Sequence, residues 1–141
     1  MRILPVDCST VLVELSVLDE VLALQASLEA EPLPGLIETL PAARTLMLRF
    51  DPARWSPDTL AETLAGRELA APPRPSGPVV EIPVRYDGED LEEVARLSGL
   101  EVSEVVRRHR QSEFTVAFCG FAPGFAYLSG GHPSFNVPRR G

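Results

Sequence analysis

The segment AAPPRPSGP, residues 70–78, divides the chain into two parts of different character. Four of its last seven residues are proline. Proline fixes φ and has no backbone N–H, so a segment this rich in proline disfavours helices and β-ladders and acts as a stiff spacer. The sequence therefore predicts an α+β protein with an N-terminal domain at 1–70, a linker at 71–78 and a second domain at 79–141.

The part before this segment has the pattern of a small α+β sandwich. Runs of β-branched and apolar residues predict strands at 10–15, 35–40 and 45–50. Helices are predicted after Ser16, an expected N-cap, and after Ser56–Pro57, a cap with proline at the first helical position. The apolar residues at helical spacing are Val17, Val21, Leu24 and Leu28, then Leu60, Leu64 and Leu69. This order predicts a ferredoxin-like domain.

The part after the segment begins with an apolar run, 78–86, that predicts a strand. Two short helices follow, separated by Gly99, which stands where a left-handed C-terminal cap belongs. The segment 113–121 then alternates as a strand, with Phe114, Val116 and Phe118 on one face.

Composition limits the classes of function. The chain has 141 residues, 20 acidic against 13 basic, and a formal net charge of −7. An acidic surface disfavours nucleic acid and anionic membranes as partners. No apolar run reaches the ~18 residues of a membrane span, and the N-terminus lacks the features of a signal peptide, so we expect a cytoplasmic protein. The two cysteines have no CxxC spacing and the two histidines no regular metal spacing, so no metal site is expected.

The two helices also have the spacing of a helix-turn-helix, and the second carries Arg107, Arg108 and Arg110. A DNA reader would turn these residues toward phosphates and base edges. Two features oppose that interpretation: the helices lie between predicted strands, and the chain is acidic. We expect a helical hairpin that closes one end of a β-domain.

Cys119 with His109 or His132 would make a thiol nucleophile and its base. Cys119 stands inside an apolar strand pattern, where cysteine usually behaves as a small hydrophobic residue. His132 follows two glycines and precedes Pro133, a pattern typical of a loop. The thiol interpretation is therefore the weaker one.

The stretch GFAPGFAYLSGGHPSFNVPRR, residues 120–140, combines aromatic residues with glycine and proline. Pro123–Gly124 fits a type II turn, and exposed N–H groups at such turns can hold an anion. Phe121, Phe125 and Tyr127 would form aromatic walls, and Arg139 or Arg140 can bind a carboxylate through two hydrogen bonds. Together they indicate a pocket for a small anionic amide.

GFAPGFAYLSG followed by PSFNVPRR resembles the signature of the Kip-inhibitor family, also known as allophanate hydrolase subunit 1 or as the B subunit of 5-oxoprolinase. The resemblance extends to EIPVRYDG, DLEEVARLSGL and the position of His109, and to PGLIETLPAARTLMLRFDP in the N-terminal part. It covers essentially the whole chain. It implies a small α+β domain followed by a cyclophilin-like β-barrel, of which 79–141 would be the N-terminal portion.

The resemblance also implies a function. Such proteins pair with a homologous second barrel subunit, and in 5-oxoprolinase with a third subunit, to open 5-oxoproline to glutamate with ATP hydrolysis. The family resembles the carboxyltransferase part of urea carboxylase, so another small amide is the alternative substrate, and one branch instead inhibits a sensor histidine kinase. Its pocket positions fall here on His109, Phe121, Pro123, Gly124, Phe125, Tyr127 and Arg139, with His109 as the expected proton acceptor.

The sequence departs from this family at its end. Members usually continue for several dozen residues past the Pro-Arg-Arg, whereas this sequence stops at Gly141. A barrel without those strands would expose strand edges and half of its core. We therefore expect the barrel and the site to be completed by residues outside this sequence.

Overall fold

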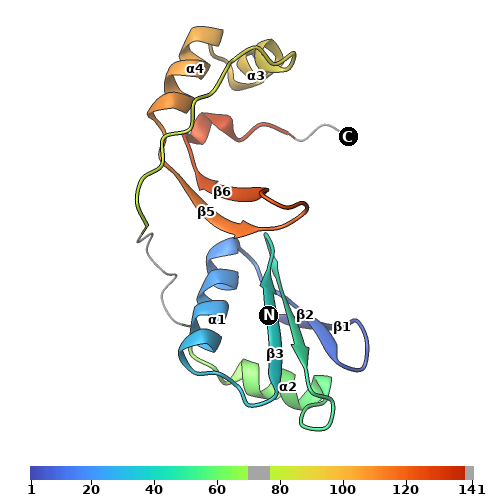
Figure 1. Cartoon of the computed structure of the whole chain (residues 1–141). Coiled ribbons are helices and arrows are strands. Elements are labelled where there is room, and N and C mark those ends of the chain that lie inside the picture. Colours follow the sequence, from blue (N-terminus) through green and yellow to red (C-terminus); the bar gives the residue numbers. More distant parts are fainter. Residues whose placement is uncertain (70–76, 139–141) are drawn as a thin grey trace. The chain divides into compact units, whose positions relative to one another are not determined.

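The computed structural model describes residues 1–69 and 77–138 (Figure 1). The chain divides into two compact units, Met1–Arg74 and Pro75–Gly141, which we call unit 1 and unit 2. Most of the predicted linker at 71–78 lies outside the described residues. The domain bounds drawn from the sequence therefore remain a proposal.

Unit 1 is one antiparallel sheet with two helices. Its elements in chain order are β1 (Arg2–Pro5), β2 (Thr10–Glu14), α1 (Leu18–Ala30), β3 (Leu36–Pro41), β4 (Thr45–Phe50) and α2 (Pro57–Ala65). The strands lie in the order β1-β2-β4-β3, and every neighbouring pair is antiparallel. The α+β class is confirmed, and the predicted β-α-β-β-α order holds with one additional strand, β1, that was not predicted from the sequence.

Strand alternation decides which face of this sheet holds the core. Val11 of β2 pairs with Leu48 of β4, and Val13 pairs with Leu46, so all four side chains share one face. They are fully buried together with residues of both helices. The buried cluster consists of Val11, Val13, Leu15, Val21, Leu24, Leu28, Leu46, Leu48, Phe50, Leu60 and Leu64. Both helices therefore cover the same face.

The opposite face of the sheet carries a second apolar row. Leu12 pairs with Leu4 on one side and Met47 on the other, and Met47 also pairs with Leu40. The row thus crosses all four strands, and Leu40 is 49% exposed. Ion pairs flank it, Arg2 with Glu14 and Arg49 with Glu38. We call Leu4, Leu12, Met47 and Leu40 the outer row.

The helix starts and ends of unit 1 confirm some predictions and correct others. Ser56 caps α2 through a reciprocal hydrogen-bond pair with Thr59, as expected. The predicted cap at Ser16 is wrong, because α1 begins after Val17 and the Ser16 N–H donates to the carboxylate of Glu20 instead. Leu69 is also not part of the α2 stripe, because α2 ends at Ala65 and Leu69 is exposed.

Unit 2 contains α3 (Leu91–Ser98), α4 (Val102–Gln111), β5 (Phe114–Cys119), β6 (Ala126–Gly130) and a 3₁₀ turn, η1 (Pro133–Phe135). Strands β5 and β6 form a two-stranded antiparallel sheet. A bulge between Val116 and Phe118 interrupts the alternation predicted for this segment. Strand β6 was not predicted.

The predicted strand at 78–86 is wrong, because these residues form no ladder among the described residues. Their apolar side chains are exposed, with Val79 at 87% and Ile82 at 74%. Among the described residues of unit 2, only Ala95 and Val105 are buried apolar residues. A strand needs a partner for its N–H and C=O groups, and a two-stranded sheet alone is marginal.

No described helix is long and apolar enough to cross a membrane.

The core face and the outer row of unit 1 should respond differently to the same substitution. Leu48→Ala should lower the free energy of unfolding by about 2–5 kcal/mol, because it leaves a cavity in a packed cluster. Leu40→Ala, on the half-exposed outer row of the neighbouring strand, should cost less than about 1 kcal/mol. Urea unfolding followed by the fluorescence of Trp55, the single tryptophan of the chain, measures both. Equal losses would contradict the assignment of the two faces.

Glu104 should make the stability of unit 2 depend on pH. Hydrogen bonds from Arg107 and Arg108 lower the pKa of Glu104 from 4.5 to about 2. Since the pKa is lower in the folded state, the carboxylate stabilises the fold above about pH 4.5, and this contribution is lost as the pH falls toward 2. Glu104→Gln should therefore lower the melting temperature at pH 7 more than at pH 2.5. Glu113→Gln is the matched control, and a Glu104→Gln effect independent of pH would refute the account.

Candidate functional site

Helix α4 places His109 in its last turn, and the tight turn before α4 sets the direction of the helix. Gly99 ends α3 with φ 66°, a left-handed conformation that costs glycine little. The Leu100 N–H then donates to the Ala95 carbonyl and the Gly99 N–H to the Arg96 carbonyl. The predicted cap at Gly99 is confirmed, and the two helices form the expected hairpin.

The His109 ring is held by one hydrogen bond and three aromatic rings. Its Nδ1 lies 2.8 Å from the hydroxyl oxygen of Tyr86. The Tyr86 ring meets it edge-on, with 5.7 Å between centroids, and the centroids of Phe114 and Phe135 lie 5.1 and 6.1 Å away. Three chain segments far apart in sequence therefore converge on this imidazole. None of the hydrogen bonds found among the described residues engages its Nε2.

His109 and Tyr86 open into a hollow of about 330 Å³, which we call the His109 hollow. Its other walls are mostly apolar: Leu91, Val94, Val105, Phe114, Gly130, Gly131, Phe135 and Val137. A side chain at Gly131 would come within 2.9 Å of the Phe114 ring, and one at Gly130 within 2.5 Å of the Glu113 carbonyl oxygen. Both glycines also have positive φ. The Gly-Gly pair thus lets the backbone pass close to Phe114 beside the hollow.

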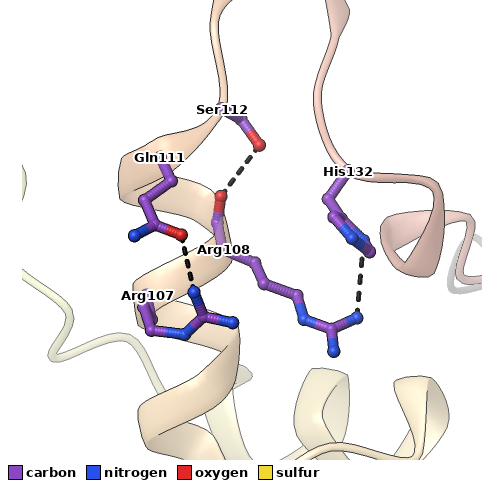
Figure 2. Close-up of a pocket in the computed structure, with 5 residues that line it drawn as sticks. All are labelled: Arg107, Arg108, Gln111, Ser112 and His132. Atoms are coloured by element: carbon purple, nitrogen blue, oxygen red, sulfur yellow. Dashed lines mark hydrogen bonds between the residues drawn. The ribbon is translucent and has the colours of Figure 1, made fainter.

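A second, polar hollow of about 360 Å³ lies on another side of α4, lined by Arg107, Arg108, Gln111, Ser112 and His132 (Figure 2). Arg107 donates to Gln111 Oε1 at 2.7 Å, and the Ser112 hydroxyl donates to the Arg108 carbonyl at 2.8 Å. Both guanidinium groups also donate to Glu104. Arg108 also contacts His132 Nδ1 and the Ser134 hydroxyl, at 3.5 and 3.4 Å. Both arginines are thus engaged by groups within unit 2, which further weakens the DNA-reading interpretation.

His132 has a structural role in this geometry. Its Nδ1 accepts the backbone N–H of Ser134 at 3.2 Å and so caps the 3₁₀ turn η1. The predicted loop character of His132 is confirmed.

Residues 120–125 of the aromatic stretch form the loop between β5 and β6, and the stretch continues into β6. The Phe125 N–H donates to the Ala122 carbonyl at 3.0 Å around Pro123–Gly124, and Gly124 has φ 76°, as the predicted type II turn requires. The Ala122 N–H also donates to the Gly120 carbonyl, which closes a three-residue turn around Phe121. Phe121 has φ 70°, a rare and strained value for a residue with a side chain.

Neighbouring rings of this loop meet edge-on and face outward, and Tyr127 also stacks on Phe118 of β5. The centroids of Phe121 and Phe125 lie 5.4 Å apart, those of Phe125 and Tyr127 5.2 Å, and those of Tyr127 and Phe118 4.5 Å. Phe121 is 89% exposed, and Phe125 and Tyr127 are also exposed. We call residues 120–127 the aromatic loop.

The structure does not bring His109 and the aromatic loop together. The pairs Phe114–Gly130 and Cys119–Ala126 mark the two ends of the β5–β6 ladder. His109 lies at the first end and the aromatic loop at the second. At about 3.3 Å per residue, the length of β5 separates these ends by about 17 Å, too far for one small ligand to touch both. Arg139, the expected carboxylate partner, lies outside the described residues.

Cys119 does not lie beside either histidine. It is the last residue of β5, at the end of the ladder away from His109, and it is exposed. The expectation that Cys119 packs as a small hydrophobic residue inside a strand is therefore wrong, and the thiol–imidazole pair has no geometric support. No group of three or more potential metal ligands occurs in residues 1–69 and 77–138.

Tyr86 was not identified as a site residue from the sequence. It stood in a predicted strand, where an aromatic residue is expected to pack. A tyrosine in an apolar segment needs a partner for its hydroxyl, and that requirement was the available signal. Only the fold shows that the partner is His109.

Comparisons with known proteins agree with the sequence resemblance. The family model described as "Carboxyltransferase domain, subdomain C and D" matches residues 1–141. The chain is 36% identical over 135 residues to the B subunit of 5-oxoprolinase from Bacillus subtilis (strain 168), covering 84% of this chain and 55% of that protein. It is 34% identical over 113 residues to the protein of the same name from Escherichia coli O157:H7, covering 77% and 51%. The chain thus spans about half the length of these relatives.

Solved structures resemble the chain as well. Two crystal forms of the protein TTHA0988 match it with TM-scores of 0.62 and 0.63 at 37% and 36% identity. These matches cover 93% and 94% of this chain and 27% of the TTHA0988 chain. Because the family model matches the sequence from end to end, the chain belongs to the family of the carboxyltransferase domain, subdomain C and D.

Proposed function

We propose that this chain is part of the B subunit of a heteromeric, ATP-dependent 5-oxoprolinase that acts in the cytoplasm. The observation that carries the proposal is the match, at 34–36% identity, to two curated relatives that are named as this subunit of 5-oxoprolinase. The family match supports the same interpretation, since it extends over both units. We further propose that unit 1 is ferredoxin-like and that unit 2 is the N-terminal portion of a cyclophilin-like barrel.

The proposed reaction breaks the C–N bond of a five-membered lactam. Water adds to the carbonyl carbon, the ring nitrogen becomes the amine of glutamate, and ATP is converted to ADP and phosphate. Phosphorylation of the amide oxygen would make the carbonyl carbon more electrophilic and so overcome the low reactivity of an unstrained amide. After water has added there, the C–N bond breaks, and a second water hydrolyses the resulting acyl phosphate to the carboxylate of glutamate and phosphate. The chain contains no lysine, so it cannot carry the glycine-rich loop ending in Lys that binds phosphates in many ATPases. We propose that ATP binds with or through the partner subunits.

His109 is the residue we assign to proton transfer. It lines a concave, mostly apolar hollow, and small-molecule sites are usually of this kind, with few well-placed polar groups. Its Nδ1 is engaged by Tyr86, which leaves Nε2 for a ligand. We propose that the lactam ring occupies the His109 hollow.

The aromatic loop contacts substrate in a different way in this proposal. A convex loop with Phe121 at its exposed tip does not enclose a ring by itself. We propose that Phe121, Pro123, Gly124, Phe125 and Tyr127 reach a substrate site across an interface between chains, and that Arg139 holds the substrate carboxylate. The strain at Phe121 supports a functional role, since such backbone conformations cluster at sites of binding and catalysis.

Assembly with further subunits is supported by the exposed apolar surface. The outer row of unit 1 is apolar and is flanked by ion pairs, the arrangement of an interface core with a polar rim. In unit 2, Val116 is 56% and Leu128 55% exposed. We propose a homologous second barrel subunit and a third subunit as the partners.

A related amide is the second candidate substrate. The family model describes a carboxyltransferase domain, which favours a subunit that acts on a urea-type amide in a similar site.

The complex purified on this chain should release glutamate from 5-oxoproline only when ATP is present. In that complex His109→Ala should lower kcat by at least about 100-fold, the usual range for loss of a general acid or base. Cys119→Ser should leave kcat unchanged, because the thiol lies at the other end of the β5–β6 ladder. A fully active His109→Ala complex would remove the assigned role. Turnover of a carboxylated urea but not of 5-oxoproline would favour the second candidate.

Two substitutions at Phe121 separate its ring from its backbone strain. Phe121→Gly and Phe121→Ala both remove the ring and should raise KM for 5-oxoproline equally in the complex. Glycine accepts φ 70° without strain, so Phe121→Gly should be more stable than Phe121→Ala by about 1 kcal/mol. Amide exchange in β5 measures that difference. An unchanged KM in the complex, together with weaker retention of the partner on purification, would show instead that the aromatic loop serves assembly alone.

A further inference from the structure

We infer that Tyr86 is the positioning residue of His109, and that the pair presents an imidazole N–H to the His109 hollow as a site for the carbonyl of a small neutral amide. The binding part of this inference stands on the geometry of this chain alone. Its catalytic part rests on the proposed function.

The hydrogen bond to Tyr86 decides which nitrogen of His109 carries the proton. The two side chains meet in a single polar contact, from the phenol oxygen to Nδ1 at 2.8 Å. A phenol has one O–H to donate, and a neutral imidazole has one nitrogen that donates and one that accepts. A phenol is the stronger donor and an imidazole nitrogen the stronger acceptor, so the Tyr86 hydroxyl donates to Nδ1. The proton of the neutral ring is then on Nε2.

Neighbouring rings fix the orientation of the imidazole. Edge-on contact with Tyr86 and tilted contacts with Phe114 and Phe135 hold it on three sides. The hydrogen bond to Tyr86 adds a directional restraint to these contacts. A histidine ring fixed at one nitrogen points the other in a defined direction, as ligating histidines do when a neighbouring group orients them.

The walls of the His109 hollow select the kind of ligand. They consist mainly of aliphatic and aromatic side chains and two glycines, around a volume of about 330 Å³. Among the described residues that line it, none is an arginine or an acidic residue. Burial of an unpaired charge in such surroundings is costly, whereas a neutral ring with one hydrogen-bond acceptor fits both the apolar walls and the N–H. The lactam group has this chemistry, and the carboxylate of 5-oxoproline would lie outside these walls.

For catalysis, this arrangement changes the role expected of His109. A ring with its proton on Nε2 donates a hydrogen bond to the amide oxygen and orients the lactam for the reaction there. It does not begin the reaction as a proton acceptor. Tyr86 acts through His109 and does not itself touch the substrate.

The test uses the full chain with ¹⁵N-labelled histidine, so it does not depend on any partner. NMR shifts of the His109 ring at alkaline pH should show an unprotonated Nδ1 and a protonated Nε2. Tyr86→Phe should give a mixture of both tautomers. Tyr127→Phe, the same change in the other tyrosine of the chain, should leave the His109 shifts unaltered.

Ligand binding is read in the same samples with 2-pyrrolidinone, a neutral lactam. It should shift the ring signals of His109, and Tyr86→Phe should weaken it about twofold to fivefold, because only a fraction of the rings then carries the proton on Nε2 in the required orientation. Cys119→Ser should leave this binding unchanged, because Cys119 lies at the far end of the β5–β6 ladder. Pyrrolidine, which lacks the carbonyl, should not bind.

Three results would overturn the inference. They are a proton on Nδ1 of His109 in the unaltered chain, the same tautomer of His109 in Tyr86→Phe as in the unaltered chain, and equal affinity of these two proteins for 2-pyrrolidinone. Should Tyr86→Phe unfold unit 2, His109→Gln replaces it, since the glutamine amide keeps an N–H donor near the same place and should retain lactam binding. Loss of binding in a folded His109→Gln chain would count against the N–H as the recognition group. If 2-pyrrolidinone binds to the chain as described but the complex opens no 5-oxoproline, the proposed function is refuted and the binding site is still supported.

Discussion

The antiparallel pairing of β5 with β6 sets the separation between the His109 hollow and the aromatic loop. One end of the ladder, at Phe114 and Gly130, forms a wall of the His109 hollow. The other end, at Cys119 and Ala126, carries the aromatic loop. Residues within about twenty positions of one another in sequence are thereby separated into a concave apolar site and a convex aromatic surface. A site formed by two chains would bring the His109 hollow of one chain beside the aromatic loop of the other.

Local signals in the sequence were strong enough to place several elements. The strand at 45–50 was predicted with its observed bounds, because apolar residues dominate that segment. Ser56, Gly99 and the Pro123–Gly124 turn were predicted because each depends on the chemistry of a few neighbouring residues. Where a feature is decided by local backbone preference, the sequence is sufficient.

Features that depend on pairing were harder to predict. Strand β6 contains serine and glycine and becomes a strand through its ladder with β5. Residues 78–86 have a strong strand pattern but pair with nothing among the described residues, so their propensity is not realised. The predicted cap at Ser16 was wrong because the Ser16 side chain caps no helix, and its backbone N–H donates to the carboxylate of Glu20.

The candidate site shows the same division. His109 was assigned through its position in a family pattern, and the structure adds Tyr86, a residue 23 positions away, as its hydrogen-bond partner. The distance between His109 and the aromatic loop could not be predicted, because it depends on the β5–β6 ladder. Two kinds of exposed surface remain, the outer row of unit 1 and the apolar side chains of unit 2. Both are consistent with a chain that works in a larger assembly.

A crystal structure of the assembled complex with 5-oxoproline bound would test the His109 hollow as the substrate site. We expect the lactam ring in the hollow, with its carbonyl oxygen within hydrogen-bond distance of Nε2 of His109 and Tyr86 still bonded to Nδ1. We also expect an aromatic loop from a different chain beside the ring. A ring bound elsewhere, with the His109 hollow filled by protein side chains, would contradict this assignment.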